Sequence, residues 1–491
     1  MTGPAAVRET HTAVLWFLDD RVHKLKKPVD LGFCDFTTVA ARREACEREV
    51  ALNARLSPEA YLGIETLLGP DGAVADHLVL MRRMPADRSL GALVREGAHV
   101  DDELRAVARR LTAFHAMARR GPEVTREGRA EALRGRWRGV LAGLRRHVGE
   151  ILDHDDVARV SALATRYLAG RRTLFDLRCE AGRIVDGHGD LLSDDVFCLR
   201  MGPVLLDCLE FDDRLRYLDT LDDAAFLAMD LEHQGGPALG ERFLRLYGEF
   251  SGDRWPASLG HHYRAYRAAT RAAVSAVRVD QGGPGVEEAR ALLGQARRHL
   301  EAGQVRLVLV GGLPGTGKTT VADGLGDRLG AAVVSSDPLR KELAGLDPTE
   351  PAPSGYGEGL YRAEHTASTY AALRARAADL LARGETVVLD ASWTDADERA
   401  RATELATQAH AELTCLECRA PREVTEPRIR SRRGSASDAT PMVAAVMSLD
   451  ADPWPEATVI DTAGPAEAAI ELALTEVHSP RSHARWTVIG R

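Results

Sequence analysis

The fold is decided by residues 312–319, which read Gly312-Leu313-Pro314-Gly315-Thr316-Gly317-Lys318-Thr319. This stretch fits the pattern G-x-x-x-x-G-K-[ST], and it lies between an apolar, strand-like run and a helix-like stretch. Glycines at these positions let successive backbone N–H groups point into one concavity at the N-terminus of the following helix. The pattern predicts a phosphate-binding loop, and therefore ATP or a related nucleoside triphosphate as ligand.

Each polar side chain of this loop has an expected partner. Lys318 is expected to reach the β- and γ-phosphates, and the Thr319 hydroxyl is expected to ligate Mg²⁺. Only five of the 64 basic residues are lysines, so a lysine retained at 318 fits a site that needs a compact ammonium group. The residues expected to contact the nucleotide here are Gly312, Gly315, Thr316, Gly317, Lys318, Thr319 and Thr320.

The composition describes a soluble protein of more than one domain. The chain has 491 residues, of which 45% are hydrophobic and 28% charged, and no run is apolar enough to suggest a membrane partner. The start of the sequence lacks the pattern of a secretory signal, so we expect a cytoplasmic protein. A formal charge of −9 disfavours nonspecific binding of nucleic acid.

The first 300 residues predict a small β-rich lobe followed by helices. A hairpin is expected over residues 12–26 around Asp19-Asp20, a helix over 39–56 and a strand over 77–84. Helices are then expected over much of 101–181 and 221–277, with short strands between them. A final helix over 286–302 leads to the apolar run before the phosphate loop, which places the domain boundary near residue 300 and gives domains 1–300 and 301–491.

Strands and helices alternate after residue 300. Strands are expected at 305–310, 331–335, 386–390 and 411–419, with helices between them, and this order predicts a doubly wound parallel sheet. The segment 351–359 interrupts the order and is expected to be a mobile loop or part of the substrate site. Residues 478–491 are expected to form a tail.

Two carboxylates follow strands of this sheet. Asp337 comes after the second strand with Arg340 three residues later, and Asp390 ends the run 387–390. At the carboxyl edge of such a sheet Asp337 could orient a hydroxyl or take its proton, while Arg340 would hold an anionic group. Asp390 could hold Mg²⁺, directly or through water. The alternative for each aspartate is a simple helix cap.

An arginine-rich segment follows the fourth strand. Arg428, Arg430, Arg432 and Arg433 fall within one and a half helical turns. Such a segment is typical of a lid that closes arginines over a triphosphate, and a solvated helix face is the alternative.

Residues 304–462 resemble the small P-loop kinases, a superfamily that includes polynucleotide 5′-hydroxyl kinases, gluconate-type kinases, chloramphenicol phosphotransferase and zeta-type toxins. The resemblance implies that Asp337 is the catalytic base, that Arg340 contacts the acceptor, and that Arg428 with Arg432 or Arg433 stabilises the transferred phosphate.

A second motif lies in the first half of the chain. His188-Gly189-Asp190-Leu191 is followed by Asp195 and then by Val204-Leu205-Leu206-Asp207. This pattern resembles aminoglycoside phosphotransferases and other protein-kinase-like enzymes. The resemblance implies that Asp190 is the base and that Asp207 binds Mg²⁺; Asp195 replaces the usual asparagine and can still bind the metal.

The same resemblance assigns the small lobe to a nucleotide. Lys24, or Lys26 on the same strand face, would pair the phosphates and a helix glutamate, either Glu49 or Glu47. We find no glycine-rich loop before that strand, and the hairpin turn at Asp19-Asp20 is expected to put negative charge where phosphates would lie. The first domain is therefore either an active kinase or a degenerate, regulatory one.

Together the two halves resemble bacterial two-domain proteins with an aminoglycoside phosphotransferase-like domain followed by a P-loop kinase domain. The resemblance implies a Mg²⁺- and ATP-dependent phosphotransferase whose working site is the P-loop domain, with a hydroxyl of a sugar, amino sugar or antibiotic as acceptor. A 5′-hydroxyl polynucleotide kinase and a nucleotide-controlled regulatory or stress module with little turnover are the alternatives.

Overall fold

The computed structural model describes residues 3–10, 12–30, 35–347, 358–431, 437 and 439–479. Most of the segment expected as a loop at 351–359, the expected tail beyond residue 479, and Arg432 and Arg433 lie outside these residues. The chain divides into two compact units. Unit 1 comprises Met1–Leu168, Phe175–Trp255 and Leu259–Gly303, and unit 2 comprises Gln304–Arg491 with the short stretches Ala169–Leu174 and Pro256–Ser258.

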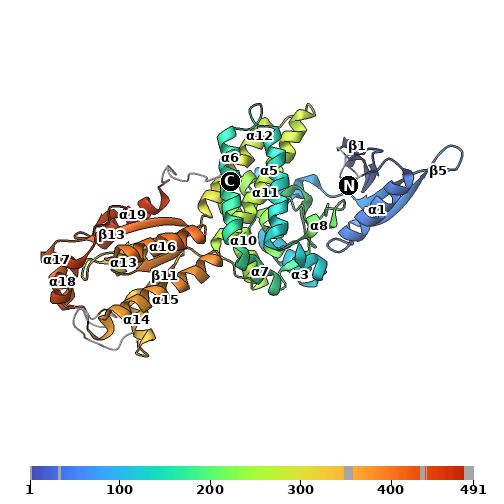
Figure 1. Ribbon diagram of the computed structural model, residues 1–491. Helices are drawn as coiled ribbons and strands as arrows, with labels where there is room; N and C mark the ends of the chain where they lie inside the picture. Colours follow the sequence, from blue (N-terminus) through green and yellow to red (C-terminus); the bar gives the residue numbers. More distant parts are fainter. Residues whose placement is uncertain are drawn as a thin grey trace, which may run out of the picture. The chain divides into compact units, whose positions relative to one another are not determined.

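Unit 1 begins with a small lobe built on an antiparallel sheet (Figure 1). The strands lie in the order β1-β2-β3-β5-β4. Their bounds are β1 (Gly3–Glu9), β2 (Ala13–Asp19), β3 (Arg21–Lys26), β4 (Tyr61–Leu68) and β5 (Val74–Arg82). Helix α1 (Val39–Asn53) packs on β5 and β4 and is capped by the Thr38 side chain, which accepts from the N–H of Ala41.

The predicted hairpin, helix and last strand of this lobe are confirmed as β2, β3, α1 and β5. Two strands were not predicted. β1 contains a glycine and a proline and lies at the sheet edge, where Val7 is exposed, so it lacks the half-buried alternation that marks a strand. β4 has a mostly half-buried or exposed pattern and a register shift beside Gly63.

The larger lobe of unit 1 is mainly helical. Its helices are α2 (Leu90–Arg95), α3 (Asp101–Met117), α4 (Pro122–Arg126), α5 (Ala130–Arg146), α6 (His154–Gly170), α7 (Arg172–Glu180), α8 (Asp213–Arg216), α9 (Thr220–Gly235), α10 (Pro237–Ser251), α11 (Ala257–Asp280) and α12 (Val286–Ala302). Helix α9 is buried along most of its length. Helix α10 packs against both α9 and α3. The helix predicted over 286–302 is confirmed as α12.

Two short antiparallel pairs complete this lobe. β6 (Ile184–Asp186) pairs with β9 (Tyr217–Asp219), and β7 (Val196–Leu199) pairs with β8 (Gly202–Leu205). Because β7 and β8 form a hairpin, Asp195 before it and Asp207 after it come to the same end. Unit 1 therefore consists of a small antiparallel sheet with one helix, followed by a helical lobe that carries the β7–β8 hairpin between Asp195 and Asp207. This arrangement is the protein-kinase-like bilobal fold.

Unit 2 is a five-stranded parallel sheet in the order β11-β12-β10-β13-β14 (Figure 1). The strands are β10 (Arg306–Gly311), β11 (Ala332–Ser335), β12 (Val387–Asp390), β13 (Glu412–Arg419) and β14 (Thr458–Asp461). The helices are α13 (Lys318–Leu329), α14 (Ser336–Leu343), α15 (Ala363–Ala382), α16 (Ala396–Gln408), α17 (Arg422–Ser431), α18 (Pro441–Asp450) and α19 (Ala466–His478). The predicted doubly wound parallel sheet is confirmed.

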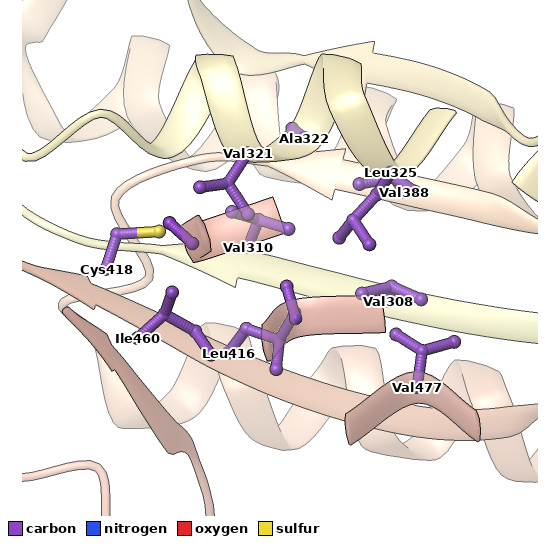
Figure 2. Packing of buried hydrophobic residues seen from close by; sticks show 12 residues of the cluster. Val308, Val310, Val321, Ala322, Leu325, Val388, Leu416, Cys418, Ile460 and Val477 are labelled. Carbon is purple, nitrogen blue, oxygen red and sulfur yellow. The ribbon is translucent and has the colours of Figure 1, made fainter. Parts of the chain in front are cut away.

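The core of unit 2 lies between this sheet and the helices α13 and α19. Val308 and Val310 of β10 and Leu416 of β13 are fully buried there against Val321, Leu325 and Val477 (Figure 2). Leu307 and Leu309, the alternate residues of β10, are also fully buried. A central parallel strand covered on both faces reads as a continuous apolar run. This core holds the carboxyl end of β10, where the phosphate loop begins.

Among the described residues, none of the helices combines the length and the apolar character needed to cross a lipid bilayer.

We expect Leu416→Ala to destabilise unit 2 by about 2–5 kcal/mol, because the fully buried side chain leaves a cavity in the sheet core. The matched control is Leu472→Ala on α19, where leucine is 44% exposed and the loss should stay within about 0.5 kcal/mol. Urea unfolding followed by the fluorescence of unit 2 tryptophans measures both. Equal losses for the two variants would contradict this core.

Candidate functional site

The phosphate loop of unit 2 has a backbone that demands its glycines. Gly312, Gly315 and Gly317 lie at φ values of 140°, 85° and 83°, in the region that L side chains rarely adopt. A Cβ atom on Gly312 would lie 2.6 Å from the carbonyl oxygen of Cys418, and one on Gly315 would lie 2.8 Å from that of Thr425. Backbone conformation and close packing therefore both select glycine at these positions.

Hydrogen bonds within the loop and from the residue that follows β14 hold the loop in place. The Thr316 hydroxyl donates to the carbonyl oxygen of Leu313 at 2.8 Å, and the Thr462 hydroxyl donates to the carbonyl oxygen of Thr316. Arg428, on α17, donates to the carbonyl oxygen of Thr462 at 2.9 Å. A Cβ atom on Gly317 would lie 3.8 Å from a guanidinium nitrogen of Arg428. Arg428 therefore lies beside the phosphate loop, as the lid assignment requires.

Thr319 and Asp390 meet at the start of α13. The Thr319 hydroxyl donates to one Asp390 oxygen at 2.9 Å, and the other oxygen of this buried carboxylate has no hydrogen-bond partner in the described part of the chain. Burial raises the pKa of Asp390, and Lys318 acts in the opposite direction. A hydroxyl and a carboxylate at the phosphate position are oxygen donors of the kind that Mg²⁺ takes together with nucleotide phosphates, so the residues fit this ion.

A cavity of about 400 Å³ opens beside Lys318. Asp337 and Arg340 line it from α14, facing side chains of α15 and of the segment that follows β12. Sites for small molecules span roughly 300–1,000 Å³, so this cavity fits a compact molecule. The polar residues that line it are Lys318, Ser336, Asp337, Arg340, Thr366, Tyr370, Ser392, Thr394, Asp395, Glu398 and Ser437.

Helix α15 fixes two of these side chains. Arg340 is 9% exposed and donates to the Thr366 hydroxyl and to the carbonyl oxygen of Leu360, both at 3.1 Å. The Tyr370 hydroxyl lies 3.1 Å from that of Ser392 and accepts the N–H of Trp393 at 3.0 Å. Hydrogen bonds therefore fix the side chains of Arg340 and Tyr370 where they line the cavity.

In unit 1, Lys24 lies between two carboxylates. Its ammonium group is 2.9 Å from Glu49 and 3.0 Å from Asp207. Burial works against the charge, but Asp207 and Glu49 raise the pKa of Lys24 well above its ordinary value, and Lys24 in turn lowers the pKa of Asp207. Glu47, the alternative partner, pairs with Arg43 on the surface of α1.

Lys26 shares the same glutamate. Its ammonium group is 2.7 Å from Glu49 and 3.0 Å from Glu210, and both Lys26 and Glu49 are buried. The structure therefore brings both candidate lysines to one helix glutamate. The only feature of the sequence that indicates this shared carboxylate is the i, i+2 spacing of the two lysines, which puts both on one strand face.

A buried carboxylate on α9 holds the loop of the second motif in place. The Asp223 carboxylate accepts the N–H groups of His188 and Gly189 at 2.7 and 2.9 Å. Asp190 lies 3.9 Å from Arg271, and burial raises its pKa. Burial, with repulsion from Asp207 and Asp190, raises the pKa of Asp195 well above its ordinary value. Three interacting carboxylates and Lys24 therefore share this end of the lobe.

The structure places the Asp19-Asp20 turn at one end of the β2–β3 hairpin, and its effect on a nucleotide stays a prediction. That turn joins β2 to β3, whereas the connection between β1 and β2 spans residues 10–12 at the other end of these strands. Lys24 pairs with Leu15, and Lys26 pairs with Ala13, next to the second connection. The two aspartates therefore lie at the end of the hairpin that is farther from Lys26.

Several residues of the unit 2 site were not predicted. Ser392, Thr394 and Asp395 follow β12 directly, so their place at a strand's carboxyl end was a signal that could have found them. Tyr370 lies within a helix, and Thr462 follows the last strand of the sheet. Neither belongs to a local motif, so only the tertiary structure reveals them.

Comparison with known proteins shows the family to which the chain belongs. An uncharacterised protein of Mycobacterium tuberculosis, Rv2004c, and one of Mycobacterium bovis, Mb2027c, are each 43% identical to it over 469 residues, or 95% of this chain and 94% of theirs. The chain belongs to their family. A family model described as an AAA domain matches residues 307–449, which include the phosphate loop and the cavity. This part of unit 2 is thus similar to AAA domains.

Among solved structures, a sugar kinase from Janibacter sp. HTCC2649 is 22% identical, with a TM-score of 0.28, over 35% of this chain and 94% of its own. A choline/ethanolamine kinase family protein from Mesorhizobium loti is 14% identical, with a TM-score of 0.38, over 61% of this chain and 92% of its own. The reaction of this protein has to be inferred from its own site residues.

We expect Gly315→Ala to abolish nucleotide binding by the phosphate loop of unit 2, because a Cβ atom there adds backbone strain and collides with Thr425 and Ile429. Gly330→Ala is the matched control, since Gly330 also has positive φ but open space around its Cβ position. Both variants should lose about 1 kcal/mol of stability through strain. Calorimetric titration with Mg²⁺ and a non-hydrolysable ATP analogue counts the nucleotides bound per chain, and a Gly315→Ala variant that binds as many as the wild type would contradict the role of the loop.

Proposed function

We propose that the protein is an ATP- and Mg²⁺-dependent phosphotransferase that moves the γ-phosphate to a hydroxyl of a small molecule, with its working site in unit 2. The observation that carries this proposal is the cavity in which Lys318 of the phosphate loop faces Asp337 and Arg340. Phosphoryl transfer needs little more from a protein than positioning and charge, and these residues supply both.

Each residue then has one task. Lys318 holds the β- and γ-phosphates, and the glycine-rich backbone donates N–H groups to them. Asp337 orients the acceptor hydroxyl and receives its proton, while Arg340 and Arg428 counter the charge that spreads over the transferring group. Thr319 and Asp390 would hold Mg²⁺, which neutralises phosphate charge when bound. Closing this site against water would suppress hydrolysis of ATP.

The cavity favours a small acceptor over a polynucleotide. Glu398 is paired with Arg374 and Arg401, and Lys318 is committed to the triphosphate, so Asp337 and Asp395 outnumber the one remaining cation of the lining, Arg340. A polyanionic strand would meet this negative wall and a chain whose formal charge is −9. A sugar, amino sugar or antibiotic of similar size fits better, so a 5′-hydroxyl polynucleotide kinase remains the weaker alternative.

Unit 1 supports a second candidate function, a nucleotide site of its own. The specific observation is that Lys24 contacts both Glu49 and Asp207, with Asp190 and Asp195 nearby, as a protein-kinase-like site requires. Such a site would serve either a second transfer, with Asp190 as base, or the regulatory role in which nucleotide occupancy controls the protein with little turnover.

We expect Lys318→Ala to lower acceptor-dependent ADP formation by about 10²–10³-fold, because a cation is removed from the transferring phosphoryl group. Chelation of Mg²⁺ with EDTA should abolish it. The assay measures ADP release from Mg²⁺-ATP over a panel of sugars, amino sugars, aminoglycosides and 5′-hydroxyl oligonucleotides. Asp190→Ala is the control, since it removes the base proposed for unit 1 and leaves unit 2 intact.

Turnover lost only in Asp190→Ala would move the working site to unit 1 and overturn the assignment. Full activity in Lys318→Ala would do the same. Tight ATP binding with no stimulation by any acceptor would favour the regulatory alternative.

The second candidate predicts two nucleotides bound per chain. We expect Lys24→Met, which keeps the length of the side chain and removes its charge, to leave only one, and Lys318→Ala to leave only the other. Lys27→Met is the matched control, because Lys27 pairs with Glu9 and not with Glu49 or Asp207. Calorimetry with a non-hydrolysable ATP analogue counts the sites. A single site that Lys318→Ala removes would refute nucleotide binding by unit 1.

A further inference from the structure

Asp395 presents a fixed carboxylate to the acceptor cavity. One of its oxygens caps α16 by accepting the N–H groups of Asp397 at 2.7 Å and Glu398 at 3.3 Å. The other oxygen makes no hydrogen bond with any part of the chain that the structure describes, and Asp395 lines the cavity beside Lys318. The capping bonds hold the carboxylate in place, so its outward oxygen is available to a ligand at little cost in side-chain entropy.

The neighbouring carboxylate is already neutralised. Glu398 is buried at the cavity wall and pairs with Arg374 of α15 and with Arg401 of α16. Asp395 forms no ion pair with a described residue. Of the carboxylates that described residues bring to the cavity, Asp337 belongs to the proposed chemistry and Glu398 to internal pairs, which leaves Asp395 to recognise the acceptor.

The bound nucleotide would strengthen this preference. Lys318 and Arg340 both line the cavity, and Arg340 lies on α14 together with Asp337. In the proposed reaction Lys318 would face the triphosphate and Arg340 the phosphoryl group that is transferred. A Mg²⁺-triphosphate keeps net negative charge, so the loaded cavity attracts a cation and repels an acid. Ser392 and Thr394 precede Asp395 in sequence, and their hydroxyl side chains line the same cavity.

We propose that the acceptor is a small polyol carrying a protonated amine, and that Asp395 binds this ammonium group. The inference rests on the proposed function of unit 2. The hydroxyl side chains of the wall would meet the hydroxyls of such a molecule, and Ala363, Ala367 and Met447 would meet its C–H groups. Asp395 is then the residue that selects the acceptor, while Asp337 acts on the reacting hydroxyl.

The test compares three probes that share one carbon skeleton: glucosamine, glucose and gluconate, which are cationic, neutral and anionic. An aminocyclitol and its amine-free parent cyclitol form a second matched pair. Full-length protein is assayed for ADP release from Mg²⁺-ATP, and KM for the acceptor is determined separately from kcat. We expect the amine-bearing member of each set to have a KM lower by about 10-fold or more, as a charge-assisted hydrogen bond supplies.

Asp395→Asn isolates the charge, because asparagine caps a helix as well as aspartate does. This variant should lose the preference for the amine, to within about 2-fold, while its thermal midpoint and its KM for ATP stay as in the wild type. Asp395→Ala removes the cap as well and should also unfold at a lower temperature. Asp397→Asn, an exposed neighbour outside the cavity lining, is the control and should keep the preference.

The outcomes separate the two levels of the proposal. A preference for the neutral or acidic probe, or an amine preference that persists in Asp395→Asn, overturns the role of Asp395 while leaving the phosphotransferase intact. If no probe and no oligonucleotide stimulates ADP release from a protein that binds ATP, both the inference and the proposed function fail.

Discussion

The backbone of the phosphate loop is the constraint on which unit 2 depends. Gly312, Gly315 and Gly317 all have positive φ, and the first two are packed too closely against the carbonyl oxygens of Cys418 and Thr425 for any Cβ atom. The loop can be held in this form because β10 before it is buried in the middle of a parallel sheet. Its shape then starts α13 at Lys318 and aims the following helix N-terminus at the phosphate position.

Both units combine lysine ammonium groups with carboxylates, but the two units differ in how far these groups are already paired with one another. In unit 2 the ammonium group of Lys318 lines an open cavity, and the buried Asp390 keeps one oxygen without a partner among described residues. In unit 1 Lys24 and Lys26 are tied to Glu49, Asp207 and Glu210. Breaking a buried ion pair such as Lys26–Glu49 typically costs about 3–5 kcal/mol, whereas the Asp207 side chain is half exposed and its pair costs less to break. A nucleotide entering unit 1 has to exchange such contacts for its own, whereas the cavity of unit 2 offers its groups directly.

Much of this arrangement could be predicted from the sequence, because the decisive signals are local. The phosphate loop, the strand ends at Asp337 and Asp390 and the second motif at Asp190 each fall within a few residues, and backbone geometry ties them to a sheet edge or a loop. The edge strand β1 escaped prediction because an exposed strand leaves no apolar alternation. Thr462 and Tyr370 escaped because their roles come from contacts 146 and 22 residues away in sequence.

The segment after β12, which lines the cavity, is held in a fixed conformation. Trp393 is 1% exposed and lies at a φ of 53°, a conformation that costs a bulky residue about 1–3 kcal/mol. Its N–H is held by the Tyr370 hydroxyl at 3.0 Å, and its carbonyl oxygen accepts from Arg399 at 2.8 Å. Because Trp393 is anchored on both sides, Ser392 and Thr394 flank a rigid point as they line the cavity. The strain therefore lies at the part of the wall to which we assign acceptor recognition in the proposed reaction, where a fixed geometry would contribute most to specificity.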